Sequence, residues 1–137
     1  MKTNFEIKEN YAVQLNGIHI DLHNNFEFNG LSETKNDIQI DFTQRKGDWI
    51  HENEFRRLKF IHKNVSFRNS SEGDNTEYPE DENTLSVISF FPKTMREIND
   101  GYMQHTKPNE NDDIIYIFQN GKMFRLNCER IELIAEK

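Results

Sequence analysis

The sequence predicts a mostly β protein that forms one domain over residues 1–137, either an antiparallel β-sandwich or a curled, barrel-like sheet. Side-chain usage is the first reason, because fourteen isoleucines and eleven phenylalanines outnumber seven leucines and two alanines, a bias that favours strands over helices. Spacing is the second, since about nine strand candidates are separated by turn signals every eight to fifteen residues. The strand candidates do not alternate with helices, so the sequence does not predict a parallel sheet.

The dipeptide Asn16-Gly17 predicts the first hairpin. It suits a two-residue type I′ turn, in which both central residues have positive φ. This turn pairs Leu15 with Ile18 and Val13 with Ile20, so the large apolar side chains share one face of the hairpin.

Further strands are predicted before and after this hairpin, over residues 4–9, 26–28 and 37–43. The third is the clearest amphipathic strand, because Ile38, Ile40 and Phe42 alternate with polar residues. Residues 45–57 are irregular, and their apolar side chains could cover a sheet edge. Three aromatic residues fall outside clear strands, so their exposure would suggest a binding surface: Trp49, Phe55 and Tyr78.

Residues 58–67 read as one strand whose apolar parity shifts, which predicts a bulge near residues 62–64. The stretch 69–83 follows with six acidic residues, no basic residue, and interruptions at Gly73 and Pro79. It is predicted to be a surface loop.

Residues 85–91 read as a buried strand that ends at Pro92. Thr94 and Glu97 then have the spacing of a capping box, which predicts one short helix at about Met95–Asp100. A second polar loop leads from this helix to the last hairpin.

Asn120-Gly121 predicts the closing hairpin. A two-residue turn pairs Ile117 with Phe124 on one face and Tyr116 with Arg125 on the other, so the hairpin is partly apolar on both sides, as a central element would be. The apolar parity changes again after Cys128, which predicts a bend at residues 129–130 before a final strand.

The net charge of −7 argues against partners that are nucleic acids or anionic membranes, and leaves a basic protein as a candidate partner. The first residues lack the apolar run of a secretory signal, no stretch is long enough to span a bilayer, and there is one cysteine. We therefore expect a cytoplasmic protein. No motif calls for a cofactor.

His19, Asp21 and His23 are the candidate metal ligands, because a continuous strand would place them on one face. A straight strand cannot converge three ligands on one ion, so a site would need a further ligand such as His51, His62 or His105. The alternative is the ordinary polar outer face of an amphipathic strand, which the pattern favours.

Cys128 could be drawn as a nucleophile with a distant histidine and acid. It ends an inward series with Phe124 and Leu126, which instead favours a buried structural thiol. The chain has no nucleophile elbow, phosphate-binding glycine loop, His-Glu-x-x-His or Cys-x-x-Cys motif. The sequence therefore favours a protein that is not an enzyme.

Acidic residues are the candidate partner-binding residues, because a negative surface speeds association with a basic protein. They lie in the loop at 69–83 and just before the closing hairpin: Glu72, Asp74, Glu77, Glu80, Asp81, Glu82, Glu110, Asp112 and Asp113.

In this general character, a short acidic β protein without catalytic motif or signal, the chain resembles the small bacterial immunity proteins that neutralise polymorphic toxins. The resemblance implies a binding module that occludes the basic active site of a toxin. Two alternatives are a small-molecule-binding barrel or sandwich, with a cavity lined by the closing hairpin, and a metal-dependent enzyme that uses the His19, Asp21 and His23 face.

Overall fold

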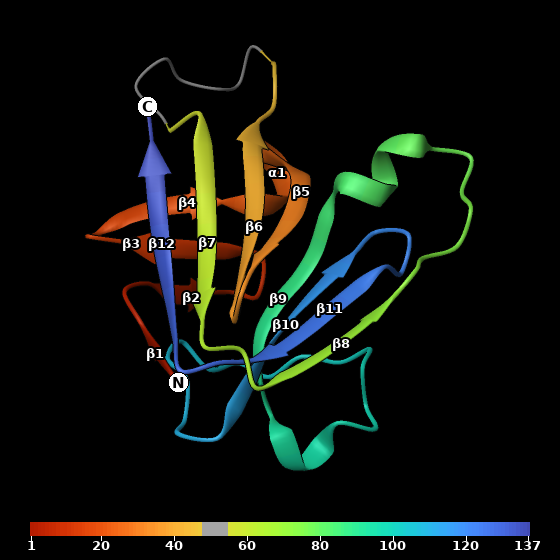
Figure 1. Cartoon of the computed structure of the whole chain (residues 1–137). Coiled ribbons are helices and arrows are strands. Elements are labelled where there is room, and N and C mark those ends of the chain that lie inside the picture. The colour runs from red at the N-terminus through yellow and green to blue at the C-terminus, as the bar shows by residue number, and fades with distance from the viewer. Residues whose placement is uncertain (48–54) are drawn as a thin grey trace.

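The protein is mostly β, as predicted, in a computed structural model that describes residues 1–47 and 55–137 (Figure 1). The described strands are β1 (Lys2–Thr3), β2 (Glu6–Lys8), β3 (Ala12–Leu15), β4 (Ile18–Asp21), β5 (Phe26–Thr34), β6 (Asp37–Gln44), β7 (Arg57–Lys63), β8 (Phe67–Ser71), β9 (Leu85–Pro92), β10 (Asp112–Phe118), β11 (Met123–Asn127) and β12 (Arg130–Glu136).

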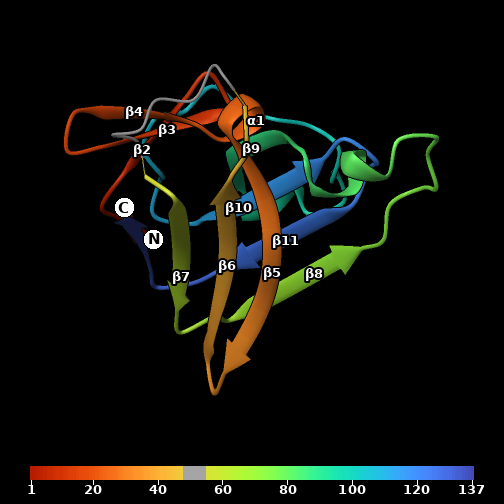
Figure 2. The ribbon, with the colours of Figure 1, turned by 90° about the horizontal axis from the view of Figure 1, so that it is seen from above.

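These strands form three sheets, with the orders β1-β12-β7-β6-β5, β8-β11-β10-β9 and β2-β3-β4. All pairs are antiparallel except β1 with β12. The three-stranded sheet lies behind β7 and β12 and runs across them, and the four-stranded sheet lies beside the five-stranded one (Figures 1 and 2). The arrangement fits the predicted sandwich or curled sheet.

Two stretches of chain pass from the five-stranded sheet to the four-stranded sheet and stay paired as they do so. β7 pairs with β12, and β8 pairs with β11. At the corner, Ser66 N donates to Asn127 O at 2.9 Å and Glu129 N donates to Lys63 O at 2.9 Å. The predicted single strand over 58–67 is therefore wrong. Its parity shift marks a bend at Asn64, which has a φ of 53°, where the chain changes sheets. The bend predicted at 129–130 is confirmed.

The first hairpin has the predicted register, with Leu15 opposite Ile18 and Val13 opposite Ile20. Asn16 and Gly17 have φ values of 52° and 80°, as a type I′ turn requires. The Asn-Gly pair thus set this hairpin as expected.

The closing hairpin is shifted by one residue from the predicted register, because its turn contains three residues instead of two. Gly121 has a φ of 88°, its N donates to Phe118 O at 2.9 Å, and Phe118 N donates to Lys122 O at 2.8 Å. This is the pattern of a type I turn followed by a glycine bulge. As a result Tyr116 pairs with Phe124 and Arg125 pairs with Ile115.

The short α-helix is α1 (Leu22–Asn25), not the predicted segment at Met95–Asp100. The 3-10 helix η2 (Lys93–Met95) reaches only the first residue of that segment. Thr94 lies inside η2, whose N-cap is Pro92, so the capping-box reading of Thr94 is wrong. A second 3-10 helix, η1 (Pro79–Asn83), lies in the acidic stretch.

One hydrophobic core joins the three sheets, and a second, smaller cluster covers the other face of the four-stranded sheet. Phe60 lies near the middle of the first, with ring centroids 5.4 Å from Phe5 and 5.8 Å from Phe42. Ile115 and Met123 belong to the second. The closing hairpin thus packs apolar side chains on both faces, as expected for a central element.

Candidate functional site

The three candidate metal ligands do not lie on one continuous strand, so that prediction is wrong. The strand ends at Asp21, which caps α1 by accepting a hydrogen bond from Asn24 N at 2.9 Å. His23 lies within the helix, and its Nδ1 is 2.7 Å from Leu85 O. His19 remains on β4, exposed. The prediction required one strand through residues 19–23, but the strand ends where Asp21 caps α1.

The two further histidines that the structure describes, His62 and His105, do not complete such a site. His62 is fully buried, and His105 lies in the segment that precedes β10. His51 and Trp49 lie outside the described residues. Within residues 1–47 and 55–137, no group of three His, Cys, Asp or Glu side chains could hold a metal ion.

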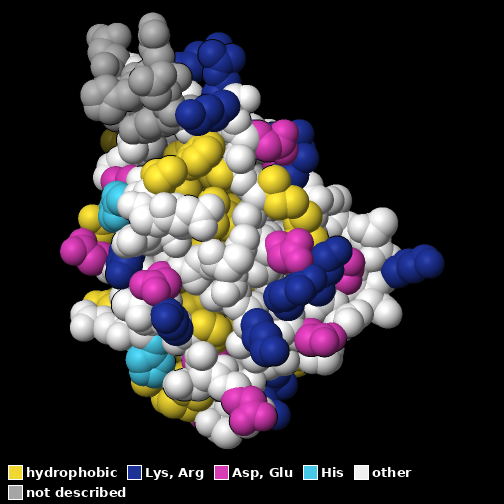
Figure 3. Space-filling view, turned by 90° about the vertical axis from the view of Figure 1, so that its left-hand side faces the viewer, with side chains coloured by type: hydrophobic (Ala, Val, Ile, Leu, Met, Phe, Trp, Pro, Cys, Tyr) yellow, Lys and Arg dark blue, Asp and Glu magenta, His cyan; other side chains and the backbone are white. Residues whose placement is uncertain are grey.

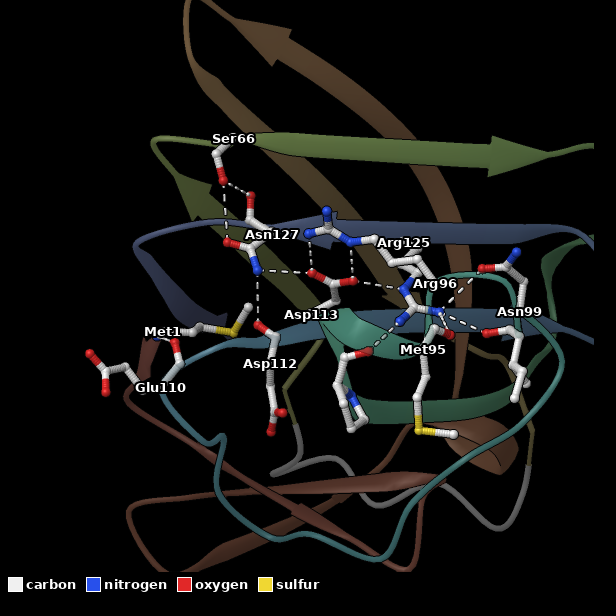
Figure 4. Close-up of polar contacts among 12 residues, drawn as sticks. Met1, Ser66, Met95, Arg96, Asn99, Glu110, Asp112, Asp113, Arg125 and Asn127 are labelled. Carbon is white, nitrogen blue, oxygen red and sulfur yellow. Dashed lines mark hydrogen bonds and ion pairs between the residues drawn. The ribbon is translucent and has the colours of Figure 1, made fainter.

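Asp112 and Asp113 are buried, so the prediction that they contribute to an exposed acidic surface is wrong. Asp113 accepts two hydrogen bonds from Arg96, at 2.8 and 2.9 Å, and one each from Arg125 and Asn127, both at 2.8 Å (Figure 4). Burial alone would raise the pKa of Asp113, but these donors hold it below its ordinary value. Asp113 is therefore a buried anion with its own internal cations.

Arg125 continues this network toward the loop that follows β9. Its guanidinium is fully buried and donates to Ile98 O at 2.7 Å, to Pro92 O at 2.9 Å and to Asn99 Oδ1 at 3.2 Å. It thereby fixes the loop at 92–99 on the outer face of the four-stranded sheet. The shifted register places Arg125 on the same face as Asp113, which the two-residue turn did not predict.

A second buried polar pair joins the sheets. His62 Nδ1 is 2.8 Å from Ile38 O, and because a carbonyl only accepts, this nitrogen carries the proton. His62 Nε2 therefore accepts from the Tyr116 hydroxyl at 2.8 Å. Burial lowers the pKa of His62 to about 4 and raises that of Tyr116. Both side chains are fully buried, and hydrogen bonds use both imidazole nitrogens and the tyrosine hydroxyl.

Cys128 is a buried free thiol in the main core, as its inward series predicted. Burial raises its pKa to about 12. A thiolate is the reactive form of cysteine, so this environment opposes a nucleophilic role.

The acidic loop, residues 72–82, is the predicted partner-binding segment that the structure leaves on the surface. Glu72, Asp74, Glu77, Glu80 and Glu82 are exposed and Asp81 is half-buried. Among the three aromatic residues outside strands, Tyr78 is 59% exposed at the middle of this loop, and Phe55 packs against the main core.

The acidic loop is held at both of its ends. Asp74 N donates to Asn120 O at 2.8 Å, and a Cβ on Gly73 would lie 2.4 Å from the Asn120 side chain, so only glycine permits this approach. At the other end, the Thr84 hydroxyl donates to Glu80 O at 2.9 Å and accepts from Arg45 at 2.6 Å. These contacts position the exposed carboxylates and Tyr78.

Glu110 lies away from the acidic loop. It precedes the first residue of β10, whereas the acidic loop is bonded to Asn120, beyond the other end of that strand. Seven residues of strand separate the two ends by about 20 Å, and Figure 1 shows them at opposite ends of the molecule. The prediction of one surface from both segments is therefore wrong. The face away from the acidic loop carries intermixed acidic and basic side chains (Figure 3).

No helix among the described residues is long and apolar enough to cross a membrane. Comparison with known proteins gives no match to this chain, whether to a protein-family model, to a curated protein or to a solved structure.

Proposed function

We propose that this protein is a non-enzymatic protein-binding module whose acidic loop docks on a basic surface of a partner protein. The observation that carries the proposal is Tyr78, a large exposed aromatic side chain on an anchored loop that also contains six acidic residues. Tyrosine is enriched among the residues that dominate binding energy, and surrounding charges steer a partner of opposite sign.

The anchoring of the acidic loop supports this role. The hydrogen bonds of Asp74 and Glu80 hold its backbone on Asn120 and Thr84 before any partner arrives. A loop that is already ordered loses less conformational entropy on binding than a free one. The Thr76 hydroxyl adds a 2.7 Å hydrogen bond to Tyr78 O beside the exposed ring.

The partner that best fits this surface is a basic protein whose active site the loop covers, as the resemblance to small bacterial immunity proteins implies. Inhibition then follows from occlusion and needs no chemistry from this chain. A cytoplasmic location accords with the free, buried Cys128. Both the inhibitor role and the location belong to the proposal.

The experiment is affinity capture from the source lysate followed by binding measurements on purified pairs. Three tagged proteins are compared: the wild type, a loop variant with Glu77→Lys and Glu80→Lys, and a control with Glu97→Lys and Asp100→Lys. All four side chains are exposed, and both variants change the net charge equally. A specific partner binds the wild type and the control but not the loop variant.

Two further measurements on the purified complex test the proposal. Tyr78→Ala should weaken the purified complex by about tenfold or more, and raised salt should weaken it further. The proposal fails if every captured protein binds the loop variant and the control equally, because general charge then explains the capture.

A further inference from the structure

A second surface feature is a groove of about 430 Å³ between the β2–β3 turn, the start of β9 and residues 102–106. This volume falls in the range of small-molecule sites. Of the residues predicted as partner-binding or metal-ligating, only His105, the possible additional metal ligand, is among the described residues that line the groove.

The β2–β3 turn at the groove has an uncommon backbone. Glu9 and Asn10, which both line the groove, have φ values of 53° and 61°. Asparagine tolerates this left-handed conformation, but glutamate is strained there, and glycine would be the unstrained choice. A strained residue that lines a groove is a typical mark of a functional site.

Two more irregularities line the same groove. Ser86 is the extra residue of a β-bulge, because Val87 pairs with Ile117 while Leu85 pairs with Phe118. Bulges commonly turn a side chain toward a site. His105 Nδ1 is buried and has no hydrogen-bond partner among the described residues. A buried polar atom of this kind indicates a place where a ligand or water completes the hydrogen bonding.

The floor of the groove is rigid. Asn10 is buried, its side-chain amide donates to Met103 O at 2.9 Å and to Ile88 O at 3.3 Å, and its own backbone O accepts from Ile88 N at 2.8 Å. Ile7 N donates to Thr106 O at 2.9 Å. The backbone that carries the lining side chains is therefore held in place before binding.

The lining defines the ligand chemistry. Tyr102 is 56% exposed and offers an aromatic face, while Gln104, Ser86 and His105 offer neutral polar groups. Glu9 is the only residue with a full charge among the described residues of the lining, so it disfavours an anion. A purely apolar ligand would leave these polar groups without partners.

We propose that this groove binds a neutral polyhydroxy compound, a sugar or short oligosaccharide, which stacks on Tyr102 and is hydrogen-bonded by Glu9, Ser86 and His105. A pyranose has an apolar face for an aromatic ring and hydroxyl groups at its edge that both donate and accept. This activity is independent of protein binding by the acidic loop.

The test is a titration of the isotope-labelled protein, followed by amide NMR shifts, with glucose, galactose, N-acetylglucosamine, cellotetraose and chitotetraose. Glucuronate serves as an anionic comparator of similar size to glucose, and choline serves as a smaller cationic one. We expect at least one neutral sugar to shift the amides of residues 7–11, 86–87 and 102–106, with smaller shifts from both comparators. The proposal is overturned if no neutral sugar shifts these amides, or if either comparator shifts them as strongly.

Two variants separate binding from folding. Tyr102→Ala should weaken the sugar affinity by about tenfold, while Tyr78→Ala, which removes a similarly exposed tyrosine elsewhere, should leave it unchanged. Glu9→Gly should also weaken sugar binding while its melting temperature stays equal to or above that of the wild type, because it relieves the strained turn. Unchanged sugar affinity in both Tyr102→Ala and Glu9→Gly would contradict the assignment.

Discussion

The imidazole of His62 and the ring of Tyr116 meet edge to face in the core, with centroids 5.7 Å apart, and share a 2.8 Å hydrogen bond. His62 comes from the five-stranded sheet and Tyr116 from the four-stranded sheet. Nδ1 donates to Ile38 O, so Nε2 can accept from the Tyr116 hydroxyl only while the imidazole is neutral, the form that burial favours.

This requirement predicts a loss of stability in acid. Burial lowers the pKa of His62 from 6.5 to about 4, so between these values the unfolded chain binds a proton that the folded one does not. The contribution of His62 is therefore complete above pH 6.5 and falls as the pH drops toward 4. The loss is on the order of 3 kcal/mol of unfolding free energy.

Urea unfolding between pH 7 and 4.5 measures this loss. His62→Gln, which cannot take up the proton, should show a smaller decrease than the wild type, and the exposed His19→Gln should behave as the wild type does. Equal decreases in the wild type and His62→Gln would assign the acid sensitivity to other groups.

Asp113→Asn should destabilise the protein strongly, because it leaves the buried guanidinium of Arg125 without its counter-ion. Removing one partner of a buried ion pair costs about 3 kcal/mol or more of unfolding free energy. The exposed Asp100→Asn is the matched control and should change it by less than about 0.5 kcal/mol. Denaturant unfolding at neutral pH compares them. A small effect of Asp113→Asn would mean that Asn127 and the loop carbonyls satisfy Arg125 on their own.

Gly73→Ala should push the acidic loop away from Asn120, since its Cβ would lie 2.4 to 2.6 Å from that residue. We expect a loss of about 1 kcal/mol in unfolding free energy, with amide shifts at residues 74 and 120–121. Gly101→Ala is the control, because its Cβ would have ordinary contacts of 3.6 Å or more. If both substitutions behave alike, the close contact does not position the loop.

Cys128 should be unreactive in the folded protein, because burial raises its pKa to about 12 and covers the thiol. A thiol reagent such as dithionitrobenzoate should label it at pH 8 only after unfolding in guanidinium. Rapid labelling of the native protein would show that the thiol is reached without unfolding.

The two Asn-Gly hairpins show how far the sequence can predict this fold. Asn16-Gly17 gave the correct register, whereas the same dipeptide at Asn120-Gly121 lies in a three-residue turn. The dipeptide permits both turns, and long-range packing decides between them. The one-residue difference places Arg125 beside Asp113, a pairing that the local pattern could not predict.

The candidate site was predicted in part. Exposure of the acidic residues at 72–82 follows from composition alone, because a run of acids with Gly73 and Pro79 cannot form a buried face. Burial of Asp113 could not be predicted in this way, because it depends on hydrogen bonds from Arg96 and Arg125, which lie in other segments of the chain. The groove had no such signal in the sequence, because glutamate rarely adopts the positive φ that Glu9 has in the three-residue turn between β2 and β3.

The corner at which β7 continues into β8 and β11 into β12 has a consequence for folding. Each of these two continuous stretches contributes one strand to the five-stranded sheet and one strand to the four-stranded sheet. Unfolding of either sheet therefore frees one end of two strands in the other. We expect slow amide exchange in the two sheets to share one opening free energy, and cleavage of the chain between Lys63 and Phe67 to disrupt both sheets at once.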